Sequence, residues 1–304
     1  MFKEEKIKFD DKFSLNVYIW EPNKDLPILG TVQLAHGMSE HLGRYIRFAE
    51  YLSSLGFIVL GADHYAHGKT CVDPFLVGVC EDYDFMDAVI KSIKLVRDHY
   101  SHYFKGNNVL FAHSMGSMAS QRYIELYPDD FSKVIISGTD YPVFKYALAK
   151  FAAKLLMKKN QITYSKLIHN MGVGAFNKKF KEEHPLYGWL TNDHEIIDAY
   201  CKDKYCGKVY PVNYYYSLAS MLRLSKKKKE RSRINRNLEV LIISGWSDPV
   251  GAFGKGPKAL SKDYLKLGVS TRLKLYNNAR HELLNELEPV KSEVYNEIKS
   301  FITN

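Results

Sequence analysis

The chain has 304 residues, of which 46% are hydrophobic and 13% aromatic, and its formal net charge is +9. This is the composition of an ordinary globular protein, and the length allows one large α/β domain with an insertion. No run approaches the ~18 apolar residues of a membrane span, and charges stand at the start of the chain, where a signal peptide needs an apolar stretch. We therefore expect a cytoplasmic protein that is at most peripheral to a membrane.

The first residues show apolar–polar alternation. Residues 6–9 and 13–20 carry apolar side chains at every second position, and Asp10 and Asp11 lie between them. Because aspartate favours turns, this pattern predicts an opening antiparallel hairpin.

Strand-like and helix-like stretches then alternate along the chain. Short continuous apolar runs predict strands buried on both faces, and apolar residues at helical spacing predict amphipathic helices. The predicted strands are 31–35, 57–62, 109–111, 133–137, 238–243 and 269–276, and the predicted helices are 45–52, 84–99, the stretch after Ser114 and 290–302. This order predicts a parallel, doubly wound sheet, in which sites form at the carboxyl ends of the strands.

The alternation stops between residues 141 and 237. This segment has helix-like patches at 144–157, 162–171 and 214–224, and it contains no convincing buried strand. We interpret residues 141–237 as a helical cap inserted after the sixth strand, above a core made of residues 1–140 and 238–304.

Much of the positive charge lies in residues 226–233, K-K-K-K-E-R-S-R. A solvated loop or helix end is the first interpretation of this run, and contact with anionic lipid headgroups is the alternative. No recognisable nucleic-acid module accompanies it, so we expect no nucleic-acid partner.

Residues 109–116, V-L-F-A-H-S-M-G, are a short apolar strand that ends in a serine and continues as a helix. A nucleophile elbow has this form, and its tight turn requires small residues two positions before and after the serine. Ala112 and Gly116 fill these positions around Ser114, although glycine is usual at both. The alternative is an ordinary serine N-cap, which the motif alone does not exclude.

A serine nucleophile needs a base, and the base needs an acidic partner. His281 lies just after the last predicted strand and Asp248 just after the strand before it. With Ser114 they follow the chain order serine, acid, histidine that this fold requires. Asp140 is the rival acid, but it opens the cap rather than a loop of the sheet. The remaining histidines on helices or in the cap are interpreted as surface residues: His99, His102, His169, His184 and His194.

The oxyanion of a tetrahedral intermediate needs preorganised N–H donors. The residue after the nucleophile, Met115, supplies one, and the loop after the strand at 31–35 supplies another. Gly37 permits close backbone approach in that loop, so we assign the second donor to Met38.

Two polar clusters could be mistaken for metal sites. His36, Glu40, His41 and Arg44 straddle a turn, where a structural Glu–Arg or Glu–His contact at a helix start is expected. A second cluster receives the same interpretation: Asp63, His64 and His67. The four cysteines form no metal-ligand pattern and are expected as free thiols: Cys71, Cys80, Cys201 and Cys206. We expect no metal and no cofactor.

The motifs together resemble the α/β-hydrolase superfamily and, within it, the monoacylglycerol lipase and lysophospholipase-like group. They are H-G-M-S-E-H-L-G-R-Y at 36–45, D-H-Y-A-H-G at 63–68, A-H-S-M-G at 112–116, G-W-S-D-P-V-G at 245–251 and A-R-H-E-L-L-N-E at 279–286. The resemblance implies Ser114 as nucleophile, His281 as base and Asp248 as its orienting acid, with Met38 and Met115 forming the oxyanion hole. Besides Ala112, the chain departs from the group at Tyr65-Ala66, where arginine and glycine are common.

The sequence therefore predicts a cofactor-free serine hydrolase acting on esters with one acyl chain, such as monoacylglycerols or lysophospholipids. A short-chain carboxylesterase and an aminopeptidase-type hydrolase are alternatives, since an amine substrate would need cap carboxylates facing the site. The cap offers five: Glu182, Glu183, Asp193, Glu195 and Asp198. Dehalogenase and epoxide hydrolase chemistry is disfavoured because it needs a carboxylate in place of Ser114. A non-catalytic binding protein would lack a triad residue, and none is missing. The oligomeric state stays open.

Overall fold

The protein is organised around one eight-stranded sheet in the computed structural model, which describes residues 1–141, 144–157 and 162–304. The strand order is β1-β2-β4-β3-β5-β6-β7-β8. The strands are β1 (Phe2–Lys8), β2 (Ser14–Trp20), β3 (Gly30–Ala35), β4 (Phe57–Ala62), β5 (Asn108–His113), β6 (Lys133–Ser137), β7 (Glu239–Gly245) and β8 (Ser270–Tyr276). The β1–β2 and β2–β4 pairs are antiparallel, and all pairs from β4 to β8 are parallel. The predicted hairpin and doubly wound sheet are thus confirmed.

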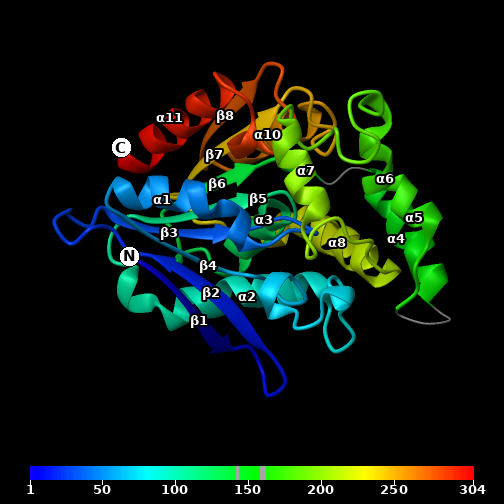
Figure 1. Ribbon diagram of the computed structural model, residues 1–304, viewed down its shortest axis with the longest axis horizontal. Coiled ribbons are helices and arrows are strands. Elements are labelled where there is room, and N and C mark those ends of the chain that lie inside the picture. Colours follow the sequence, from blue (N-terminus) through cyan, green and yellow to red (C-terminus); the bar gives the residue numbers. More distant parts are fainter. Residues whose placement is uncertain (142–143, 158–161) are drawn as a thin grey trace.

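Helices cover both faces of the sheet (Figure 1). One face packs against α1 (Ile46–Ser54) and α11 (Val290–Thr303), and the other against α2 (Phe85–His99), α3 (Met115–Leu126) and α10 (Lys255–Lys266). Short 3₁₀ helices complete the connections: η1 (Leu42–Tyr45), η2 (Gly68–Thr70), η3 (Pro74–Leu76), η4 (Ser101–Tyr103), η5 (Asn177–Lys179) and η6 (Leu283–Asn285).

The central strand β5 shows how the sheet separates two hydrophobic cores. Val109 and Phe111 pack toward α1 and α11, whereas Leu110 and Ala112 pack toward α2 and α3. All four side chains are fully buried. Because successive residues of a strand point to opposite faces, a continuous apolar run is what a strand covered on both sides requires.

The chain between β6 and β7 is helical in its described parts. Its helices are α4 (Phe144–Met157), α5 (Lys166–Met171), α6 (Val173–Phe176), α7 (His194–Lys202), α8 (Val212–Ser225) and α9 (Lys228–Arg231). In Figure 1 these green to yellow helices stand beside one end of the sheet. Residues 142–143 and 158–161 of the predicted cap lie outside the described residues, and the division into cap and core stays a prediction.

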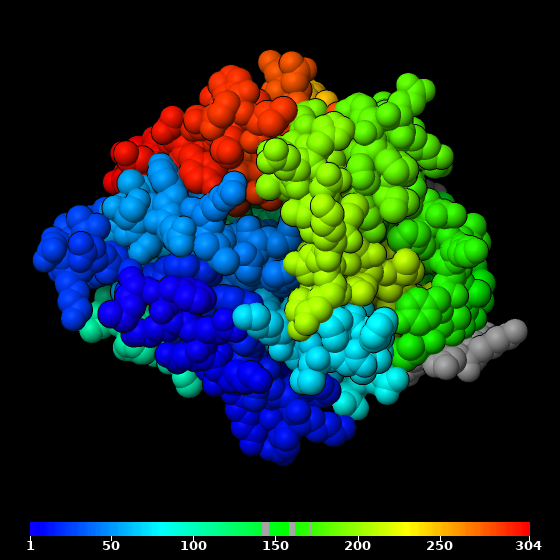
Figure 2. All heavy atoms as spheres, viewed as in Figure 1, coloured from blue at the N-terminus to red at the C-terminus, as the bar shows by residue number. Residues whose placement is uncertain are grey.

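This segment also contacts the loop after β4. In Figure 2 the yellow-green atoms lie against cyan atoms of that loop, and the Asn213 amide donates a hydrogen bond of 2.7 Å to the Cys80 carbonyl oxygen.

None of the helices in the described ranges combines the length and the hydropathy needed to cross a membrane.

Helices α7 and α10 were not predicted from the sequence, nor was the four-residue helix α6. Helix α10 is rich in lysine and buries only five residues, among them Leu260 and Tyr264, and α7 buries only Ile197 and Tyr200. A stripe of two large apolar side chains is too narrow to stand out as a helical period. Packing against the rest of the protein, rather than the spacing of apolar residues in the sequence, stabilises these helices.

Candidate active site

Ser114 occupies the sharp turn between β5 and α3, with φ 51° and ψ −117°. A positive φ is strained for a residue with a Cβ, so the surrounding structure must hold it. Gly116 makes the turn possible, because a Cβ there would lie 2.4 Å from the Ala35 carbonyl oxygen of β3. The Ser114 side chain makes no capping hydrogen bond to α3 and instead contacts His281. The turn therefore presents the hydroxyl outward from the strand end.

The structure brings Ser114, His281 and Asp248 together. The Nε2 atom of His281 lies 2.8 Å from the Ser114 Oγ, and its Nδ1 atom lies 2.9 Å from the Asp248 Oδ2. Asp248 is fully buried, and its Oδ1 accepts a hydrogen bond of 2.8 Å from the Val250 N–H. The rival acid Asp140 instead accepts a hydrogen bond of 2.6 Å from the Tyr146 hydroxyl. Both ring nitrogens of His281 are thus used, one toward each predicted partner.

The electrostatics favour a histidine that accepts a proton. Burial alone lowers the pKa of His281, but the adjacent Asp248 carboxylate outweighs it, and the pKa is raised above the ordinary value. The His113 ring lies 4.6 Å from the His281 ring, and burial lowers the pKa of His113 to about 4. His113 is therefore neutral near pH 7 and places no positive charge beside the base.

The two predicted oxyanion donors lie next to the serine. Met115 begins α3, so its N–H is one of the unpaired donors at the positive end of the helix dipole. The Met38 loop passes close by, because a Cβ on Gly37 would lie 3.0 Å from the Ser114 Cβ. Within the described part of the chain, neither the Met38 nor the Met115 N–H donates a hydrogen bond.

A buried ion-pair bridge supports this loop. Arg44 donates to Glu282 through two hydrogen bonds of 2.8 and 2.7 Å and to the Glu40 Oε2 at 2.8 Å. The Glu40 Oε1 accepts hydrogen bonds from the Gly37 N–H at 2.6 Å and the Tyr45 hydroxyl at 2.9 Å. The Glu–Arg contact was predicted, but the Glu282 partner was not. The bridge ties the loop before η1 to the residue that follows His281.

Ser39, directly after Met38, is held by α7 and the segment that follows it. Its φ is 58°, again in the left-handed region. The Tyr210 hydroxyl accepts from the Ser39 N–H at 2.8 Å, and the Ser39 carbonyl oxygen accepts from the Tyr200 hydroxyl at 3.0 Å and the Gly207 N–H at 3.3 Å. The Ser39 Oγ exchanges two hydrogen bonds with the Lys208 backbone. We call these five contacts the Ser39 clamp.

The histidines near this loop make structural contacts. The His36 Nε2 accepts a hydrogen bond of 2.9 Å from the His64 N–H, and its Nδ1 lies 2.8 Å from the Gly37 carbonyl oxygen. The Tyr210 hydroxyl lies 2.8 Å from the His67 Nε2. Burial lowers the pKa of His64 and His67 to about 3 and that of His36 well below its ordinary value, so all three are neutral. Neutral, buried rings, of which His36 and His67 bond to neighbouring groups, agree with the predicted structural role.

A cavity of about 410 Å³ opens above Ser114. This volume lies within the range of ~300–1,000 Å³ that is common for ligand pockets. Its lining is mostly apolar and comes largely from the segment between β6 and β7, including Ala149, Ile168, Phe176, Trp189, Tyr215 and Leu218. Among the described carboxylates, only Glu40 and Glu282 line it, and both are paired with Arg44. The five cap carboxylates considered for an amine substrate lie elsewhere.

Comparisons with known proteins agree with this geometry. The model of the family described as "Serine aminopeptidase, S33" matches residues 27–288. The chain is 26% identical over 284 residues to the monoglyceride lipase homolog of monkeypox virus, covering 90% of this chain and 89% of that protein. It is 25% identical over 293 residues to the monoglyceride lipase of Rattus norvegicus, covering 94% and 85%. A carboxyl esterase from Bacillus coagulans superposes with a TM-score of 0.86 at 24% identity, covering 99% and 97%.

These matches confirm the predicted resemblance to the α/β-hydrolase superfamily and its monoacylglycerol lipase-like group. The family match runs from before β3 to beyond His281 and includes both strand ends that carry Ser114 and Asp248. The chain therefore belongs to the serine aminopeptidase S33 family of α/β-hydrolases.

Proposed function

We propose that the protein hydrolyses carboxylic esters with a single acyl chain, of the monoacylglycerol or lysophospholipid type. One observation carries the proposal: the Ser114 hydroxyl lies at the floor of an apolar cavity, 2.8 Å from the nitrogen of a buried histidine that is itself bonded to a buried carboxylate. The similarity to a monoglyceride lipase and to a monoglyceride lipase homolog supports an ester hydrolase.

The reaction proceeds in two halves. The Ser114 Oγ attacks the ester carbonyl carbon while His281 Nε2 takes the hydroxyl proton, and the Met38 and Met115 N–H groups stabilise the oxyanion. The intermediate collapses, the alcohol leaves with the proton from His281, and the acyl group stays on Ser114. Water then attacks this ester, again with His281 as base, and the carboxylic acid is released. Asp248 holds the His281 ring and stabilises its charged form.

The cavity favours an acyl chain over an amine. A protonated amine needs an available carboxylate, but Glu40 and Glu282 are both already paired with Arg44. An apolar lining gains ~0.8 kcal/mol for each CH₂ group that it takes out of water. We assign residues 141–237 the role of a cap that encloses the acyl chain. Because both lining carboxylates are paired with Arg44, we rank the aminopeptidase alternative below the lipase-like one.

Two lysines give the lysophospholipid class its own support. Lys181 and Lys208 line the cavity, and a phosphate-bearing headgroup would complement their charge. The exposed face of α4 carries Leu148, Phe151 and Leu155, with Lys154 on the same helix. Apolar residues with a basic rim suit the surface of an anionic membrane, where both substrate classes reside. We include peripheral membrane contact in the proposed function.

The test is hydrolysis of a p-nitrophenyl ester series from acetate to palmitate. Each CH₂ group that enters the cavity should raise kcat/KM by about fourfold, because ~0.8 kcal/mol corresponds to that factor, until the chain outgrows the cavity. Ser114→Ala should abolish the activity. Activity confined to acetate would favour the short-chain esterase, and turnover that survives in Ser114→Ala would refute the mechanism. Paired assays on a monoacylglycerol and a lysophospholipid of equal chain length then separate the two headgroups.

A further inference from the structure

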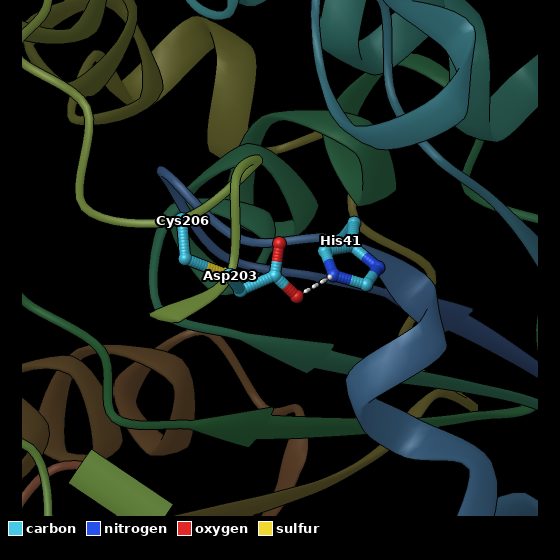
Figure 3. A group of neighbouring side chains, drawn as sticks. All are labelled: His41, Asp203 and Cys206. Atoms are coloured by element: carbon cyan, nitrogen blue, oxygen red, sulfur yellow. Dashed lines mark hydrogen bonds and ion pairs between the residues drawn. The ribbon is translucent and has the colours of Figure 1, made fainter. Parts of the chain in front are cut away.

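Three potential metal ligands meet at the joint between the oxyanion loop (residues 36–41) and the turn after α7. The His41 Nε2, an Asp203 carboxylate oxygen and the Cys206 Sγ all lie within 4.8 Å of one another. Figure 3 shows the Asp203 carboxylate pointing at the His41 ring, with Cys206 on its other side. The side chains of His41 and Asp203 are 15% and 29% exposed, and Cys206 is 6% exposed. An ion can therefore reach the group from one side.

We infer that His41, Asp203 and Cys206 form a binding site for a zinc-like divalent cation. Imidazole nitrogen, carboxylate oxygen and thiolate sulfur are the three ligand types that Zn²⁺ accepts, and three protein ligands leave a fourth position for water. Hard cations such as Mg²⁺ and Ca²⁺ prefer oxygen ligands only, so the sulfur disfavours them. The inference concerns binding and does not depend on the proposed hydrolysis.

The present spacing is close to what tetrahedral zinc requires. Zinc–ligand bonds of ~2.0–2.3 Å place ligand atoms about 3.4–3.6 Å apart. The His41 Nε2 and Asp203 Oδ2 are 2.8 Å apart, so this pair must open slightly, and Cys206, which lies within 4.8 Å of both, must approach by at most ~1.4 Å. Asp203 and Cys206 lie in one turn, closed by a hydrogen bond of 3.1 Å from the Cys206 N–H to the Asp203 carbonyl oxygen. Small side-chain rotations therefore suffice.

The charges around the sulfur also suit a dication. The charged groups that act on the Cys206 thiol include three carboxylates, Asp203, Glu40 and Glu282, and the cation Arg44. A cysteine thiol is ordinarily protonated near pH 7, whereas a metal binds the thiolate. Binding must release this proton to solvent, and His41 must carry its own proton on Nδ1 so that Nε2 can bind.

Zinc at this position would fasten two segments that are distant in the sequence. His41 follows the Ser39 clamp on the oxyanion loop, and Asp203 and Cys206 lie between Tyr200 and Gly207, which are parts of the same clamp. Because a cation that binds only the folded state stabilises it by mass action, zinc should raise the melting temperature of the protein.

The experiment is a titration of the reduced, metal-free full-length chain with Zn²⁺ by calorimetry. We expect one ion per chain and an enthalpy that varies with the ionisation enthalpy of the buffer, because the thiol proton is released. Co²⁺ used as a probe should give a thiolate-to-metal absorption band. Cys206→Ser should abolish that band and weaken binding by more than about tenfold.

Two further variants control for misfolding and for other sites. His41→Gln changes a partly exposed ligand and should weaken Zn²⁺ binding as Cys206→Ser does, so the inference is testable even when one variant fails to fold. Cys201→Ser removes an exposed thiol on α7 and should bind Zn²⁺ like the wild type. The inference is overturned when the wild type takes up no ion, when Cys206→Ser and His41→Gln bind as tightly as the wild type, or when Cys201→Ser loses the site.

Discussion

Replacing Arg44 with methionine tests the buried bridge that supports the oxyanion loop. The Arg44 side chain is 12% exposed, and its two partner carboxylates are each 5% exposed. Methionine keeps much of the side-chain length but removes the charge and the hydrogen-bond donors. Glu40 and Glu282 are then left as two neighbouring buried carboxylates without their cation.

The expected loss is large and depends on pH. Removing one partner of a buried ion pair costs about 3–5 kcal/mol of unfolding free energy, because the remaining charge stays uncompensated. In the wild type, burial opposes ionisation of Glu40 and Glu282, but Arg44 and the other groups around them together outweigh it, and the pKa of both is lowered. Their contribution to stability is therefore present above the unfolded pKa of ~4.3 and is lost only as the pH falls through the lower folded pKa.

In Arg44→Met the pKa shift of the two carboxylates on folding reverses its sign. Burial and mutual repulsion raise the folded pKa of the two carboxylates above ~4.3, so the penalty is complete at pH 8 and shrinks as they take up protons. As the pH falls, the difference in unfolding free energy between the wild type and the variant should narrow by about 1.4 kcal/mol per pH unit for each carboxylate that is titrating. Urea unfolding at pH 8 and pH 5 measures both values.

Arg47→Met is the matched control, because Arg47 is exposed on α1 three positions later. It should change stability by no more than ~0.5 kcal/mol at either pH. A loss below about 1 kcal/mol in Arg44→Met, or a loss equal at pH 8 and pH 5, would refute the reasoning. Turnover gives a second readout: without Arg44, the Glu40 carboxylate that holds the Gly37 N–H is less well positioned, so kcat should fall, by at most the ~10²–10³-fold that removal of one oxyanion donor costs.

Three further predictions concern the base, the turn and the clamp. In a plot of kcat/KM against pH, the fall on the acid side should lie above pH ~6.5, because Asp248 raises the pKa of His281 and only the neutral ring can act as base. Asp248→Asn should move this fall to lower pH and reduce kcat by about 10⁴-fold. Gly116→Ala should lower both the melting temperature and kcat, because its Cβ would lie 2.4 Å from a β3 carbonyl oxygen; an unchanged melting temperature would contradict this close approach. Tyr210→Phe should cost about 1–3 kcal/mol of stability in urea unfolding and lower kcat more than it raises KM, since it strips a partner from the clamped N–H; an unchanged kcat would contradict this role.

The parallel sheet and the close approach of Ser114, Asp248 and His281 could be predicted from the sequence for one physical reason. Parallel strands bring their carboxyl ends to the same edge, so a polar residue just after each apolar run is carried to a common place. Each of the three residues occupies such a position: Ser114 follows β5, Asp248 follows β7 and His281 follows β8. Chain order and topology together limited the combinations, and no side-chain detail was needed.

The supporting contacts were beyond the sequence because they join residues far apart without a repeating pattern. Arg44 and Glu282 are 238 positions apart, and Ser39 and Tyr210 are 171 apart. Tyr210 lies in the irregular stretch before α8, where no periodicity indicates the direction of a side chain. The run at 226–233 is also only partly solvated, because Arg231 is buried and paired with Asp263, and Glu230 is paired with Arg122.

The Ser39 clamp limits how the proposed cap can move. Residues 200–210 donate to or accept from all three polar positions of Ser39, the residue next to the proposed donor Met38. A movement that carried residues 200–210 away from the sheet would break five hydrogen bonds and release a strained φ of 58°, so the oxyanion loop would be lost with it. A cap that admits substrate while the catalytic geometry persists must therefore leave residues 200–210 in place, and α4 to α6 are the helices of this segment that make none of the clamp's contacts. These are also the helices where large apolar residues such as Phe151 and Leu167 are exposed.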